Sequence, residues 1–376
     1  MRRVCYISGS RADFGHVEST LTRAHRSGAL DISVCVTGMH LLPSFGLTVR
    51  DIEASALRIT ARIPVPLEDS TGASMAKGIG RELIGITEAL ERERPDLTLV
   101  LGDRGEMLAG ALASIHLGIP IVHLHGGERS GTVDEPIRHA ISKLAHYHFV
   151  ATDKSRERLI HMGELPAHVF VTGAPGLEGL EKLVSRTRDE LCRALGLDPL
   201  RPLALVVFHP VLQEADQAGK QMNELLRAVL SNGLQAVCLS PNADSGGIAV
   251  KRVLDGYKRH SAIRLVVHLP RAEFVSWMAA ADVMVGNSSS GIIEAASFGL
   301  PVVNVGSRQR LRERSPNTID TEAEEALIAE AISSCLKNGR GPGVNVYRGE
   351  NAVQRIIDLL TMIPLDPSVL QKVNAY

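Results

Sequence analysis

The sequence predicts an α/β protein, because short β-branched apolar runs alternate along the chain with longer amphipathic segments. This alternation is typical of parallel strands joined by crossover helices. The alternation pauses at a proline-containing stretch, residues 196–202, and then starts again. With 376 residues, of which 44% are hydrophobic, the chain can bury two cores. We therefore expect two Rossmann-like halves with parallel sheets facing a central cleft.

The apolar runs give the expected strands of each half. Those of the first half are residues 4–7, 32–36, 97–101, 121–124, 148–151 and 169–171. Those of the second half are residues 203–208, 236–239, 264–268, 283–285 and 302–305. Two further segments are expected to be a charged helix at 177–198 and a polar, glycine-rich loop at 68–80. The carboxyl ends of the strands should surround the cleft, where open α/β sheets bind ligands.

Three parts follow from this order of elements. Residues 1–180 form the first Rossmann-like domain and residues 181–350 the second. Residues 351–376 begin with an amphipathic segment that we expect to be a helix packing back on the first domain.

Composition excludes several classes of protein. The formal net charge of −1 argues against a nucleic-acid binder, and the lack of an apolar stretch of about 18 residues argues against a membrane span. No apolar core follows Arg2 and Arg3, so a signal peptide is not expected. The five cysteines are widely spaced and none forms a CxxC pair, which favours reduced thiols and a cytoplasmic protein.

The stretch 287–294 indicates an anion site, because it reads as a turn of small residues between a strand and a helix. Backbone N–H groups and the hydroxyls of Ser288, Ser289 and Ser290 converge where a phosphate oxygen can bind. Glu294 lies about one helical turn further on, within reach of a sugar hydroxyl. A well-capped helix without any ligand explains the same residues.

Two clusters of the first half also follow predicted strands. In residues 9–15, Arg11 stands among glycine and serine residues that suit a phosphate, although a helix cap with a solvent-facing arginine is the simpler reading. In residues 101–106, Asp103 precedes Arg104. Asp103 is either a general acid or base or an N-cap aspartate.

Residues 123–139 carry the densest group of ionisable side chains. His123 and His125 are expected on one strand face, with Glu128 close behind and Asp134 at the start of a helix. Paired histidines near Asp103 suit a metal, but a metal site needs a third ligand, so we expect no metal. Asp134 is either a helix cap or an acid/base group, and the two roles are compatible.

Polar residues also end the predicted strands of the second half. His209, Asn242 and Arg308 follow three of these strands, and the serine turn follows another. A histidine, an asparagine, serines and an arginine at neighbouring strand ends suit recognition of a nucleotide diphosphate. We expect His209 and Arg308 to neutralise the charge of a departing diphosphate.

Taken in order, these stretches resemble the hydrolysing UDP-N-acetylglucosamine 2-epimerases of the sialic and legionaminic acid pathways. The resemblance runs over roughly residues 1–310, and 126–128 with 134–135 and 137–143 are its most specific part. The matching stretches are 9–15, 36–40, 101–104, 123–146, 208–211, 240–245, 286–294 and 306–308.

The resemblance implies a GT-B-like fold, a second domain that binds UDP, and no metal or cofactor. It implies that C2 loses its proton and UDP leaves C1, giving a 2-acetamidoglycal. Water then adds at C1 while C2 is reprotonated on its opposite face. The implied acid/base and leaving-group residues are Asp103, His125, Glu128, Asp134 and His209. The implied UDP and substrate contacts are Arg11, Arg104, Asn242, Ser288, Ser289, Ser290, Glu294 and Arg308. A homodimer or dimer-based homo-oligomer is expected by analogy.

One position departs from part of the family. Some members carry a catalytic glutamate where this chain has His125, so His125 or Glu128 takes over proton transfer, or the substrate differs. We expect UDP-N-acetylglucosamine as substrate and N-acetylmannosamine and UDP as products. The alternatives are a UDP-2,4-diacetamido-2,4,6-trideoxyhexose substrate, a GT-B glycosyltransferase, a non-hydrolysing epimerase and a nucleotide-sugar sensor.

Overall fold

The computed structural model describes residues 1–67 and 69–376 and contains two sheets whose paired strands are all parallel. The order of the first sheet is β3-β2-β1-β4-β5-β6-β7. Its strands are β1 Arg2–Ser8, β2 Leu30–Thr37, β3 Arg58–Ile63, β4 Leu97–Leu101, β5 Ile121–Leu124, β6 Tyr147–Val150 and β7 Val169–Val171. The order of the second sheet is β10-β9-β8-β11-β12-β13. Its strands are β8 Leu203–Val207, β9 Gln235–Leu239, β10 Ile263–Val266, β11 Val283–Gly286, β12 Val302–Val305 and β13 Thr318–Thr321.

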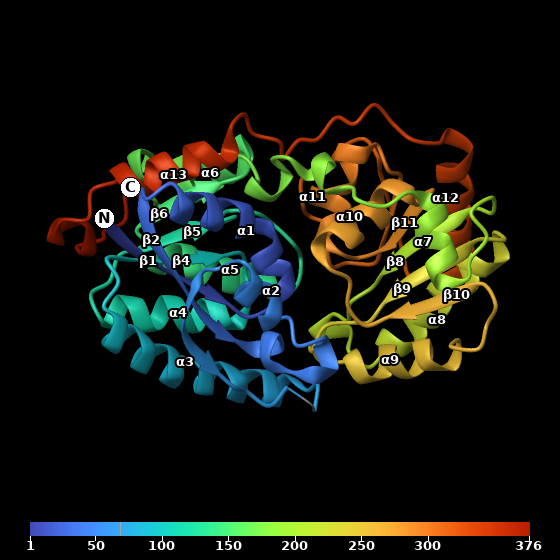
Figure 1. The fold of residues 1–376 in the computed structure, drawn as a ribbon, viewed down its shortest axis with the longest axis horizontal. Coiled ribbons are helices and arrows are strands. Elements are labelled where there is room, and N and C mark those ends of the chain that lie inside the picture. Colours follow the sequence, from blue (N-terminus) through green and yellow to red (C-terminus); the bar gives the residue numbers. More distant parts are fainter. Residues whose placement is uncertain (68) are drawn as a thin grey trace.

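Both sheets follow the strand order of a doubly wound Rossmann fold. In each, the chain first adds strands on one side and then reverses to the other side. The reversal lies between β1 and β4 in the first sheet and between β8 and β11 in the second. Figure 1 shows the two halves side by side. Ligands bind at such reversal points, so the order of strands already marks the place of a site.

Helices cover the sheets on both faces. Those of the first half are α1 Arg11–Arg26, α2 Val49–Ala54, α3 Gly72–Glu93, α4 Gly105–His116, α5 Asp134–Leu144 and α6 Asp153–His161. Those that follow are α7 Arg188–Leu195, α8 Ala218–Ser231, α9 Gly247–Gly256, α10 Arg271–Ala280, α11 Ser289–Ile293, α12 Glu325–Asn338 and α13 Ala352–Met362. None of the helices within 1–67 and 69–376 is long and apolar enough to cross a membrane.

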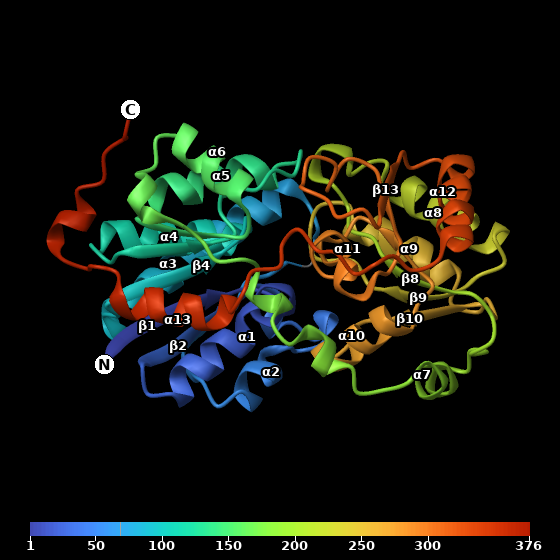
Figure 2. The ribbon, with the colours of Figure 1, turned by 90° about the horizontal axis from the view of Figure 1, so that it is seen from above.

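The chain crosses between the halves twice, and the two crossings touch. After α12 the chain runs back to the first half, where α13 lies beside α1 (Figures 1 and 2). Val353, Ile356 and Leu360 of α13 are buried in the core of the first sheet. The crossing segments meet where the backbone N–H of Ala174 donates to the carbonyl of Tyr347 at 2.9 Å. We propose 1–180 and 181–350 as the two domains, with 351–376 joining the first.

Two local expectations were wrong, and two strands were missed. The edge strands β3 and β13 were not predicted, because both are short, polar and only partly buried. The expected helix 177–198 is broken, since Thr187 caps a new helix, α7, that ends at Gly196. The expected loop 68–80 is largely helical from Gly72, because Thr71 and Ser74 form a capping box. Glu68, the first residue of that loop, lies outside the described residues.

We expect Gly286→Ala to destabilise the second half. Gly286 has φ +140°, and a Cβ there would overlap the backbone carbonyl of Val207 on the neighbouring strand. The matched control is Gly233→Ala, because Gly233 also has positive φ but no atom within 4 Å of the added Cβ. Gly286→Ala should cost roughly 2 kcal/mol more in urea unfolding than the control. Equal midpoints would mean that the end of β11 relaxes around the new methyl group.

Candidate active site between the two sheets

The residues that follow β1, β4, β8 and β11 face one another across a cleft between the halves. A cavity of about 180 Å³ lies there. All five predicted catalytic side chains line it, together with several of the predicted ligand contacts. These lining residues are Asp103, His125, Glu128, Asp134 and His209, with Arg104, Asn242, Ser288, Ser289 and Arg308. The two reversal points therefore form one site.

A neighbouring cavity of about 160 Å³ extends the site toward the second half. The remaining predicted ligand residues, Arg11, Ser290 and Glu294, line this second cavity. It shares Ser289 and His209 with the first cavity, so the two are continuous. Every residue predicted for the site thus lies in one of the two cavities, and their individual roles stay predictions.

The carboxylate of Asp103 is held by arginines from both halves. Arg138 of α5 pairs with it directly, and Nη2 of Arg312 lies 3.7 Å from Oδ2. Arg138 is fully buried and also donates to the carbonyl of Glu128 at 3.0 Å. Burial lowers the pKa of Arg138 to about 9, so its positive charge depends on the partners that stabilise it.

His125 and Glu128 form a hydrogen-bonded pair. Nδ1 of His125 lies 2.6 Å from Oε1 of Glu128, whose other oxygen pairs with Arg312. Burial first, and then the charge of Arg312, lower the pKa of His125 to about 4. The ring is therefore neutral near pH 7, and we infer that Nδ1 carries the proton donated to Glu128. Nε2 has no hydrogen-bond partner within the described chain, so its lone pair is free to accept a proton.

His123 does not join this pair, contrary to expectation. β5 ends at Leu124, and His125 adopts φ +59°, which turns it away from the strand pattern. His123 is buried, with Nε2 2.7 Å from the carbonyl of Gly102 and Nδ1 3.0 Å from Ser142. It supports the β4 turn that carries Asp103. The described residues contain no group of three or more potential metal ligands.

Asp134 is the first residue of α5, not its cap as one reading expected. The residue before it, Val133, occupies the cap position. Nη2 of Arg308 lies 3.6 Å from Oδ2 of Asp134. Burial raises the pKa of Asp134; Arg308 opposes this, whereas Asp244 adds to it. Asp134 therefore holds a proton at higher pH than an ordinary aspartate.

His209 is fixed to the β11 turn by its backbone. Asn287 accepts from the N–H of His209 at 2.7 Å and donates to its carbonyl at 2.8 Å. The N–H of Asn242 donates to Nδ1 of His209 at 3.2 Å, so Nε2 carries the proton. Burial, followed by nearby Arg308, lowers the pKa of His209 to about 3. The free chain thus offers a neutral N–H donor here, whereas the sequence suggested a charged histidine.

The serine turn joins a strand to a helix as predicted, but the helix, α11, is short. Ser288 caps α11 by accepting from the N–H of Ser290, and their hydroxyl oxygens lie 2.8 Å apart. α11 ends at Ile293, and Glu294 behind it is buried.

Glu294 pairs with Arg271, and Nδ1 of His16 lies 3.9 Å from it. Burial acts to raise the pKa of Glu294, but Arg271 and His16 lower it below its ordinary value. Glu294 is therefore a carboxylate, the form that accepts hydrogen bonds from hydroxyl groups.

Three residues of the site were missed from the sequence: Arg312, Arg271 and His16. The first of these lies four residues after Arg308 in the arginine-rich loop that follows β12. That local density of arginine after a strand was a signal that could have identified it. Arg271 begins α10 and His16 lies in α1, and neither stands in a distinguishing pattern. Arg271 belongs to the same half as Glu294, whereas the facing of the two halves brings His16 to it.

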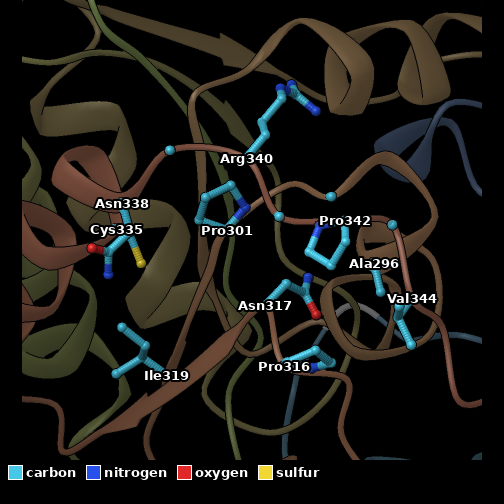
Figure 3. Close-up of a pocket in the computed structure, with 14 residues that line it drawn as sticks. Ala296, Pro301, Pro316, Asn317, Ile319, Cys335, Asn338, Arg340, Pro342 and Val344 are labelled. Atoms are coloured by element: carbon cyan, nitrogen blue, oxygen red, sulfur yellow. The ribbon is translucent and has the colours of Figure 1, made fainter.

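A separate pocket lies wholly in the second half (Figure 3). Pro301, Asn317, Cys335 and Pro342 line it, and Arg340 extends away from it to donate to backbone carbonyls such as that of Ala281. Among the described residues that line it there is no carboxylate and no histidine. This lining therefore differs from that of the cleft, which holds carboxylates and histidines.

Comparisons with known proteins identify the family that the chain resembles. The family model described as UDP-N-acetylglucosamine 2-epimerase matches residues 22–361. A UDP-N,N'-diacetylbacillosamine 2-epimerase (hydrolyzing) of Legionella pneumophila is 50% identical over 100% of both chains. A GDP/UDP-N,N'-diacetylbacillosamine 2-epimerase (hydrolyzing) of Campylobacter jejuni is 33% identical over 86% of this chain and 85% of its own.

Among solved structures, the UDP-GlcNAc 2-epimerase from Neisseria meningitidis bound to UDP-GlcNAc has a similar fold. Its TM-score is 0.79 at 18% identity, and the match covers 95% of this chain and 99% of that one. The predicted GT-B-like arrangement of two Rossmann-like halves is confirmed.

We expect Arg138→Met to destabilise the protein by about 3–5 kcal/mol, because it leaves the Asp103 carboxylate without its buried partner. The control is Arg129→Met in the same segment. The side chain of Arg129 is 46% exposed and lies 3.6 Å from Glu135. Its loss should cost about 0–1 kcal/mol. Urea unfolding compares the two variants, and equal stability would show that Asp103 does not depend on Arg138.

Proposed function

The chain belongs to the UDP-N-acetylglucosamine 2-epimerase family, and from this premise we propose that it hydrolyses and epimerises a UDP-linked diacetamido sugar. The proposed substrate is UDP-N,N'-diacetylbacillosamine, a 2,4-diacetamido-2,4,6-trideoxyglucose derivative. The 50% identity over the full length of the Legionella enzyme supports this choice. The second candidate is UDP-N-acetylglucosamine, the sugar in the description of the family model and the substrate expected from the sequence.

One observation of the structure carries the reaction type. Acid/base groups of the first half, His125 with Glu128 and Asp134 near Asp103, line the same cavity as the phosphate-binding candidates of the second half. Inversion at C2 requires proton removal on one face and proton delivery on the other. Two separate acid/base groups opposite a diphosphate site satisfy that requirement.

His125 suits the role that a glutamate has in other members of the family. Its neutral ring presents Nε2 as a proton acceptor, while Glu128 accepts the Nδ1–H and stabilises the imidazolium that forms. Asp134, whose pKa is raised, is proposed to deliver the proton to the other face of C2. Asp103 forms an ion pair with Arg138, which fixes the position of its carboxylate in the cavity.

The second half supplies the stabilisation that the leaving group needs. Cleavage of the C1–O bond leaves a UDP oxygen with growing negative charge. The proton on Nε2 of His209, the guanidinium of Arg308 and the hydroxyl of Ser289 are the proposed donors to it. Glu294 is the proposed acceptor for ribose hydroxyls. Arg11, Arg104 and Asn242 complete the proposed substrate contacts.

The wider setting is also a proposal. We propose a cytoplasmic homodimer that supplies a 2-epimerised amino sugar for synthesis of nonulosonic acids. A glycosyltransferase activity is not favoured, because both relatives above are named as hydrolysing epimerases.

The reaction is tested by proton NMR in deuterated water with each of the two UDP sugars. We expect UDP and a free sugar with inverted C2 that carries deuterium at C2, formed faster from the diacetamido substrate. Asp134→Asn should lower turnover by at least about 100-fold while UDP still binds. Release of UDP without inversion or deuterium would contradict the proposed mechanism.

The pH profile tests the pairing of Asp134 with Arg308. Arg308 lowers the pKa of Asp134, so Arg308→Ala raises it and moves the alkaline limb of kcat/KM to higher pH, by about one unit. The limb moves upward because Asp134 delivers a proton only when it is protonated. Arg308→Lys keeps the charge and should leave the limb near its original position. An unmoved limb in Arg308→Ala would remove Asp134 from this role.

A further inference from the structure

A third cavity opens from the active site into the first half. It has a volume of about 60 Å³ and shares Met39, Asp103, Arg104 and Asp134 with the active-site cavity. With the cavity that holds Arg11 and Glu294 it shares only Met39. The third cavity therefore lies on the side of the active site that is farther from the proposed nucleotide contacts. We call it the α3 pocket.

Five carboxyl groups and Arg104 line the α3 pocket together with seven apolar side chains. The apolar side chains that are only partly buried are Leu67, Met75, Ile79, Val133 and Ile137. Met75 and Ile79 lie on one face of α3, at spacing i and i+4, and Glu82 follows one turn later. Covering such partly exposed apolar side chains with an apolar group lowers the free energy. The pocket is thus suited to a ligand with methyl groups.

Two of the carboxyl groups, Glu82 and Glu106, differ in their partners. Arg104 donates to Glu106 at 2.8 Å, which keeps that group paired. Glu82 accepts from the hydroxyl of Thr37 at 3.2 Å. Burial, and next the charge of Glu106, raise the pKa of Glu82 to about 8. Near neutral pH, Glu82 is a neutral carboxyl with an O–H to donate.

The geometry of the sugar ring indicates which groups of the substrate can reach the α3 pocket. C1 carries the diphosphate and C4 is the ring atom opposite C1, so groups on C4 and C5 point away from the nucleotide. In UDP-N-acetylglucosamine these groups are a hydroxyl and a hydroxymethyl. In the diacetamido trideoxy sugar they are an acetamido and a methyl group. Contact with the apolar side chains of Met75 and Ile79 favours the methyl groups of the second set.

We propose that the α3 pocket binds the C4 acetamido and the C5 methyl groups of the sugar, and that Met75, Ile79 and Glu82 determine the preference for the diacetamido substrate. Glu82 donates to the acetamido carbonyl, while Met75 and Ile79 contact the methyl groups. This inference rests on the proposed function.

The test measures kcat/KM for both UDP sugars and compares their ratio between variants. Met75→Gln places an amide among the apolar side chains, and Glu82→Leu removes the donor; each should lower the ratio of diacetamido to N-acetylglucosamine activity about tenfold. Glu82→Gln keeps an N–H donor of the same size and should restore the ratio to within about threefold. Ile84→Gln is the matched control on α3, because Ile84 is 64% exposed and outside the pocket.

The outcomes separate this inference from the proposed function. A ratio that stays at the parental value in Met75→Gln and Glu82→Leu, with both proteins folded by circular dichroism, overturns the α3 pocket as the specificity site. If Glu82→Leu is unfolded, Met75→Gln alone decides, since Met75 is only partly buried. A parent protein that releases no epimerised sugar from either substrate overturns the proposed function instead.

Discussion

The site depends on arginines of one half that compensate carboxylates of the other. Asp103, Glu128 and Asp134 line one cavity, where burial and mutual repulsion would otherwise neutralise them. Arg308 and Arg312, both in the loop after β12, reach across to these acids. The charges of these carboxylates are therefore balanced in this way only while the two sheets face each other. Each half alone would carry an incomplete site.

The strand order explains why these groups meet at all. Each sheet reverses its winding at one point, and a crevice lies there at the carboxyl ends of the two neighbouring strands. Small residues let the backbone pass there, as at Gly286, and Asn287 ties the ends of β8 and β11 together through the backbone of His209. Polar turns at four strand ends thus converge without any long loop.

Much of this arrangement was predictable from the sequence, because hydrophobic periodicity and the residue preferences of turns depend on neighbouring residues. The central strands and the strand-end positions of Asp103, His209 and Ser288 follow from apolar runs that stop at polar turns. Pairings between distant segments were not predictable, since nothing local links Arg312 to Glu128. His125 shows a second limit: its positive φ turns it out of the strand, and period-two reasoning cannot detect that.

The two contacting crossings between the halves limit how the cleft can open. One crossing runs past Ala174 and the other past Tyr347, and a backbone hydrogen bond joins them. Gly173 and Gly349 also approach so closely that a side chain on either would overlap the other crossing. Two linking segments that are hydrogen-bonded to each other restrict the rotation of one half against the other more than a single segment would. This restriction favours the arrangement in which Arg308 and Arg312 lie beside their carboxylates.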